Sequence, residues 1–131
     1  TYILAGVAGI SLFVSAIMIL TVLYISVVER TQEIGVIKAI GGRNKDIRRI
    51  FVSESFLIGL FSGLLGVGIA ALLSAIGNVA VERIFGTTIL HMTPTYALLG
   101  ILASVIISVI AGVFPANKAA KLDPIEALRH D

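Results

Sequence analysis

Three long stretches without Asp, Glu, Lys or Arg dominate the pattern of apolar and polar positions along the chain. They cover residues 2–28, 55–81 and 84–117, and the last of them opens with a loop. A helix of about 20 apolar residues crosses a bilayer, because a helix satisfies its own backbone hydrogen bonds without water. The pattern therefore predicts an all-α membrane protein with three transmembrane helices at about 2–28, 55–81 and 95–114.

Composition agrees with this prediction. The chain is 57% hydrophobic and 14% charged, whereas soluble domains are about 45–50% apolar and about 25% charged. Three spans use most of the apolar residues and leave none for a water-soluble core. No basic residue or cleavage motif marks the first stretch as a removable signal. The absence of cysteine excludes disulfides, thiolate metal sites and cysteine nucleophiles.

The distribution of basic residues predicts the orientation. The segment 29–54 carries six of them: Arg30, Lys38, Arg43, Lys45, Arg48 and Arg49. The tail 115–131 carries three, and the loop between the second and third spans carries only Arg83. Because basic loops stay in the cytoplasm, the segment and the tail are expected to be cytoplasmic and the N-terminus extracytoplasmic. The expected location is the cytoplasmic membrane, with several passes.

The segment 29–54 also contains acidic residues, and two uses of its charge remain open. It can anchor to lipid headgroups or bind a protein. Its four acids make it mixed in sign, which favours a protein contact: Glu29, Glu33, Asp46 and Glu54. Glu54 lies at the membrane edge of the second span, where an unpaired carboxylate is costly. An ion pair with Arg30, Lys38 or Arg49 is therefore expected.

Small residues recur along one face of the second and third spans. The second span has Gly59, Gly63 and Gly66, and the third has Gly100, Ser104, Ser108 and Gly112. Small side chains at a spacing of three or four allow two helix backbones to approach closely. We expect these spans to pack on each other or on another subunit, and such stripes are more typical of helix contacts than of substrate sites.

A short amphipathic helix is predicted over 31–40, between the first two spans. Ile34, Ile37 and Ile40 recur at a spacing of three and are expected to form one apolar face, flanked by Arg30, Glu33 and Lys38. Gly41 and Gly42 are expected to stop this helix, and Asn44 to cap the next one. The helix can rest among lipid headgroups or dock into a groove of a cytoplasmic partner.

The tail is predicted to be ordered. Pro115 is expected to end or kink the third span. Asp123 followed by Pro124 is typical of a helix start. The apolar face of Ile125 and Leu128 then needs a partner.

Two segments resemble a known family. The stretch ERTQEIGVIKAIG at 29–41 is similar to the ERTxEIGxxKAxG segment of FtsX-like ABC permeases, and PANKAAKLDPIEALR at 115–129 is similar to that family's ending. The resemblance is greatest to macrolide-exporter and lipoprotein-release permeases. It implies that this chain supplies the last three helices of a four-helix protomer, after an upstream helix and an extracytoplasmic domain. It also implies a dimer of permeases, a cytoplasmic ABC ATPase and, in some members, an extracytoplasmic adaptor.

The resemblance further implies a function. The helix over 31–40 would couple the ATPase to the membrane part and relay ATP-driven motion for efflux or release of drugs, peptides or lipoproteins. The implied coupling residues are Arg30, Thr31, Glu33, Ile34, Ile37, Lys38, Ile40, Gly41 and Gly42. ATP and Mg²⁺ would bind the partner ATPase, because this chain has no GxxxxGK[ST] loop, and no catalytic, metal or nucleic-acid site is expected here. Two alternatives are a regulatory scaffold that activates cell-wall hydrolases and a small self-contained membrane protein.

Overall fold

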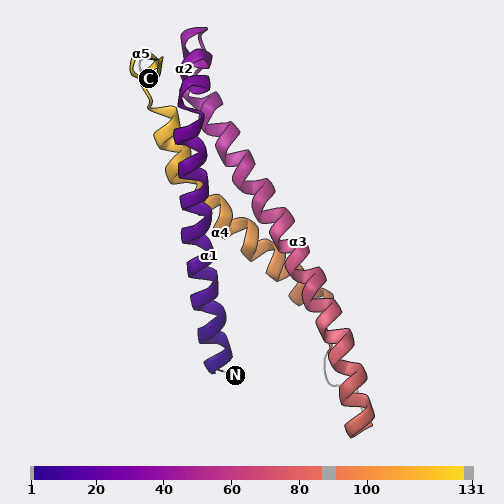
Figure 1. Ribbon diagram of the computed structural model, residues 1–131. Helices are drawn as coiled ribbons and strands as arrows, with labels where there is room; N and C mark the ends of the chain where they lie inside the picture. Colours follow the sequence, from indigo (N-terminus) through magenta and orange to yellow (C-terminus); the bar gives the residue numbers. More distant parts are fainter. Residues whose placement is uncertain (1, 87–90, 129–131) are drawn as a thin grey trace.

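The computed structural model describes residues 2–86 and 91–128, and this part of the chain is helical apart from short connections (Figure 1). Its five helices are α1 (Tyr2–Glu29), α2 (Thr31–Ala39), α3 (Asn44–Phe85), α4 (Pro94–Ala120) and α5 (Pro124–Leu128). Three of them, α1, α3 and α4, are long and apolar enough to cross a membrane. The all-helical prediction with three spanning helices is confirmed.

Helix α3 is much longer than the span that the sequence predicts within it. It has 42 residues, which correspond to about 63 Å, or roughly twice the thickness of the hydrocarbon core. Residues 44–54 therefore form a rigid extension of the second span. Asn44 is the first helical residue and not the cap. The cap position belongs to Arg43, whose backbone N–H donates to the Asp46 carboxylate at 3.2 Å.

Helix α4 continues through Pro115, which lies inside it and is buried. The proline therefore does not end the span, although it removes one backbone hydrogen bond within the helix. In Figure 1 the orange N-terminal part of α4 lies along α3, whereas its gold C-terminal part lies beside α1. One helix thus contacts both of its neighbours.

Glycines on α3 allow its backbone to approach that of α4. A Cβ atom on Gly59 would lie 2.8 Å from the Cα atom of Val105, and one on Gly63 would lie 3.0 Å from the Cα atom of Ile101. At the same crossing, the Ser104 hydroxyl donates to the Gly59 carbonyl at 2.9 Å. At these positions the small residues form a contact between two helices.

The contact continues toward α1 and weakens in the other direction. A Cβ atom on Gly112 would overlap the hydroxyl of Ser55 and lie 3.2 Å from Cδ1 of Leu23, so α1, α3 and α4 meet at this glycine. Gly66 has no neighbouring atom within 4 Å of such a Cβ, and for Gly100 the nearest is Val67 Cγ2 at 3.9 Å. The very close approach of the two backbones is therefore limited to the stretch from Gly59 to Gly63, and side chains such as Val67 fill the wider space beyond it.

We predict that Gly59→Ala destabilises the bundle. The added methyl group would meet the α4 backbone, which cannot rotate away, and such overpacking costs about 1–3 kcal/mol. Thermal unfolding of the protein in detergent measures the loss. Gly66→Ala is the matched control, because its methyl group enters open space. Equal stability of the two variants would contradict the close crossing.

Candidate functional site

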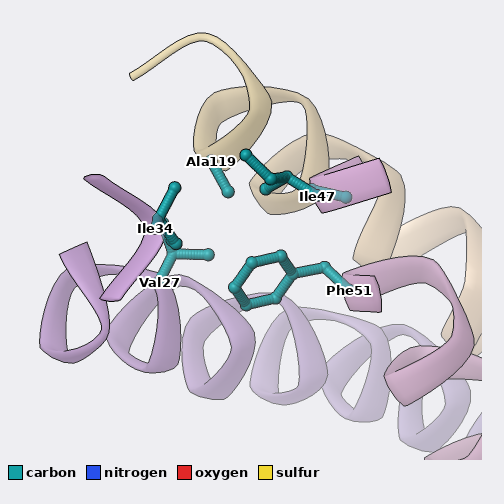
Figure 2. Packing of buried hydrophobic residues seen from close by; sticks show 6 residues of the cluster. Val27, Ile34, Ile47, Phe51 and Ala119 are labelled. Atoms are coloured by element: carbon teal, nitrogen blue, oxygen red, sulfur yellow. The ribbon is translucent and has the colours of Figure 1, made fainter. Parts of the chain in front are cut away.

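One end of the bundle brings together the end of α1, the start of α3, the end of α4 and both short helices (Figure 1). Buried apolar side chains from four helices form a cluster there: Val27, Ile34, Ile47, Phe51, Ala116 and Ala119 (Figure 2). Ile37, Val52 and Leu122 pack around this cluster and are partly buried. We call this set the junction cluster. It fixes α2 against the ends of all three long helices.

Ile34 and Ile37 of α2 and Ile40, which follows its last residue, do not share one outward face. Ile34 is 4% exposed and belongs to the junction cluster, Ile37 is partly buried beside it, and Ile40 is 82% exposed. A spacing of three falls about 60° short of a full turn, so two such steps rotate the side chain by about 120°. The exposed apolar side chains here are those of Val36, which is 50% exposed, and of Ile40 at the end of α2.

The two glycines after α2 form a tight helix end. The Gly42 N–H donates to the Ile37 carbonyl at 2.8 Å, and the Gly41 N–H donates to the Lys38 carbonyl at 3.1 Å. Gly41 has a φ of 100°, which side chains disfavour, and a Cβ on Gly42 would lie 2.6 Å from the Ile37 carbonyl oxygen. This is a Schellman motif, and it sets the turn from α2 into α3.

Lys38 points into the protein and joins α2 to the end of α4. Its ammonium group donates to the backbone carbonyls of Ala120 at 2.7 Å and of Leu122 at 2.5 Å. Carbonyls at a helix C-terminus have no partner within the helix and carry partial negative charge, so a cation is favourable there. The residue was expected to flank a docking face, but its charge is used within the chain.

The junction of α1 and α2 is almost continuous. The Arg30 N–H donates to the Ser26 carbonyl at 3.1 Å, and the Thr31 hydroxyl reaches the carbonyls of Val27 and Val28. The Arg30 guanidinium lies 3.9 Å from the Glu54 carboxylate. Of the partners expected for Glu54, Arg30 is the one that pairs with it. Both side chains are partly exposed, so the pair adds little stability.

Two further contacts involve the last part of α4 and the tail, and the sequence predicted only the second of them. The Lys118 ammonium donates to the Tyr24 hydroxyl at 2.7 Å and lies 4.4 Å from the centre of its ring, which links α4 to α1. No local pattern indicates this contact between distant positions.

The tail begins α5 with the cap that the sequence predicts. The Asp123 carboxylate accepts a hydrogen bond from the Ile125 N–H at 2.9 Å, and α5 lies against α2. Ile125 is exposed, whereas Ala127 is buried.

Comparison with known proteins agrees with this arrangement. The FtsX-like permease C-terminal family matches residues 5–124. The ABC transporter permease YknZ of Bacillus subtilis is 42% identical over the whole chain, which covers 32% of that protein. The macrolide export ATP-binding/permease protein MacB of Psychrobacter cryohalolentis is 39% identical over the whole chain, which covers 19% of it. An ABC transporter permease of Methanocaldococcus jannaschii is 38% identical over 98% of the chain and 33% of its own length.

The chain thus spans about a third or less of these relatives, and its three long apolar helices make it an integral membrane protein. It belongs to the FtsX-like permease family.

Proposed function

We propose that this chain relays the motion of a cytoplasmic ABC ATPase across the membrane, with α2 as the helix on which the ATPase acts. The observation that carries the proposal is the junction cluster. It packs α2 against the ends of all three long helices, while Val36 and Ile40 remain exposed on the other side of α2. Exposed apolar side chains on a short helix beyond the membrane suit a groove in a partner protein.

The contacts around α2 explain how a displacement would spread. Almost continuous backbone joins α2 to α1, the Gly41–Gly42 turn joins it to α3, and Lys38 joins it to α4. Closely packed interiors resist compression and transmit strain. A push or pull on α2 therefore moves the ends of all three spans together.

The remaining parts of the proposal come from charge and from the relatives. The excess of basic residues at this end favours a cytoplasmic location for it. ATP and Mg²⁺ bind the ATPase subunit or domain, and a second permease copy completes the transporter. The names of the relatives favour export as the direction of transport, with an extracytoplasmic domain or adaptor receiving the motion.

We predict that position 40 contacts the ATPase. A photo-crosslinking residue, p-benzoylphenylalanine, placed at position 40 of the full-length protein should crosslink to the ATPase subunit or domain, because the Ile40 side chain is exposed on α2. Mass spectrometry of the crosslinked peptides identifies the partner. Position 84 is the matched control, since Ile84 is an exposed isoleucine at the opposite end of α3. Crosslinks at position 40 to lipid alone would contradict the assignment.

Ile40→Asp is expected to reduce coupling without unfolding the protein. The substitution removes an apolar contact and buries a carboxylate at the proposed interface, so ATP-dependent transport should fall at least about tenfold. Transport and ATP hydrolysis are measured in proteoliposomes. Ile84→Asp should leave both unchanged. A substitution at the partly buried Ile37 would be less informative, because it would also disturb the junction cluster.

Lys38→Met is expected to loosen the connection between α2 and α4. Loss of two charge-assisted hydrogen bonds should cost roughly 1–3 kcal/mol of local stability and increase amide hydrogen exchange at Ile125 and Ala127. ATP hydrolysis should continue while transport falls. Lys121→Met is the matched control, because Lys121 is exposed and its ammonium forms no hydrogen bond or ion pair within the described residues. Unchanged amide hydrogen exchange in the Lys38 variant would show that this contact does not stabilise the connection between α2 and α4.

A further inference from the structure

The first turns of α3 carry exposed cations that the junction cluster does not use. Arg43, Lys45, Arg48 and Arg49 are all exposed. Within residues 2–86 and 91–128, none of their side chains forms a hydrogen bond or an ion pair. The nearby Asp46 accepts a hydrogen bond from the backbone of Arg43. Four cations against the single carboxylate of Asp46 leave residues 43–49 with an excess of positive charge.

The length of α3 places these cations at two different depths. Glu54 marks the end of the apolar run, and Arg49 and Arg48 lie five and six residues farther out. At the rise of a helix this is about 8–9 Å, close to the outer limit of a headgroup layer about 5–8 Å thick. Arginine side chains are long and flexible enough to reach back into such a layer. Lys45 lies about 13 Å from Glu54, beyond the headgroups.

The exposed face of α3 that follows Arg49 toward the apolar run can contact a phospholipid. Ile47, Phe51 and Ser55 are buried and define the packed face of α3. Arg49 and Ser53, four residues apart, lie on the exposed face. Phe56 and Leu57 follow, and both remain about half exposed. From outside to inside, α3 thus offers cation, hydroxyl and hydrocarbon, which is the order of phosphate, glycerol and acyl chain in a phospholipid.

We propose that Arg48 and Arg49 bind the headgroup phosphate of an anionic phospholipid in the leaflet next to α2, which the proposed orientation makes the cytoplasmic leaflet. A guanidinium group can donate two parallel N–H hydrogen bonds to the oxygens of one phosphate, which an ammonium group cannot do with the same geometry. The excess positive charge of this turn selects an anionic lipid over a zwitterionic one. The bound lipid fixes the height of α3 in the membrane.

The test measures retained lipid in the full-length protein. The protein is reconstituted in phosphatidylcholine with phosphatidylglycerol, extracted gently and examined by native mass spectrometry. Combined Arg48→Gln and Arg49→Gln should lower the retained phosphatidylglycerol roughly tenfold or more and leave phosphatidylcholine unchanged. Full retention of phosphatidylglycerol by this variant would overturn the proposal.

Two controls separate the lipid site from other uses of the charge. Combined Arg43→Gln and Lys45→Gln removes the same charge farther from the membrane, and Arg83→Gln removes a cation at the other end of α3. Both should keep the lipid. Loss of lipid from the Arg43 and Lys45 variant to the same extent would overturn the assignment to the headgroup layer. Loss of ATPase contact by the Arg48 and Arg49 variant, with lipid retained, would show that these residues face a protein instead.

Discussion

Four helices of this protein are held together at the junction cluster, where Val27, Ile34, Phe51 and Ala119 lie among the buried side chains. The cluster lies at and beyond the end of the apolar run of α3, which begins after Glu54. If this end of the bundle projects from the bilayer, as the proposed function requires, water is the alternative environment for these side chains, and burying them is favourable through the hydrophobic effect. The spans gain no such energy inside a bilayer, because lipid chains are as apolar as leucine. The most strongly driven packing of the chain therefore lies at the end that bears α2.

Within the apolar spans, α3 and α4 are held together by a different kind of contact. The crossing of α3 and α4 relies on backbones that approach at Gly59 and Gly63 and on one hydrogen bond from Ser104. These contacts are local, and the two backbones approach less closely at Gly66 and Gly100. A bundle with a firm end and a looser opposite half is suited to receive motion at the first and to change shape at the second. In the proposed function, the ATPase acts on the firm end and the opposite half changes shape in response.

Much of the fold could be predicted from local patterns. Apolar length gives the three spans, paired glycines give the end of α2, and Asp123 before a proline gives the start of α5. The inward position of Ile34 and the partners of Lys38 could not be predicted, because they depend on α4, more than 80 positions away in the sequence. A periodic pattern identifies which side chains share a face, but not which neighbour covers it. The helix α2 was therefore predicted from the sequence, whereas the side chains that it exposes, Val36 and the following Ile40, had to come from the structure. The role of α2 as a coupling site stays a prediction.

The central claim is that α2 and the end of α4 move as one body, and a distance measurement tests it most directly. Residues 1–131 contain no cysteine, so spin labels can be attached at cysteines introduced at the exposed positions 39 and 121. Double electron–electron resonance then reports their separation in the full-length protein, without nucleotide and with ATP bound. If α2 and the end of α4 move as one body, the two labels give one narrow distance that is the same in both states. A distance that changes or broadens on ATP binding would contradict it.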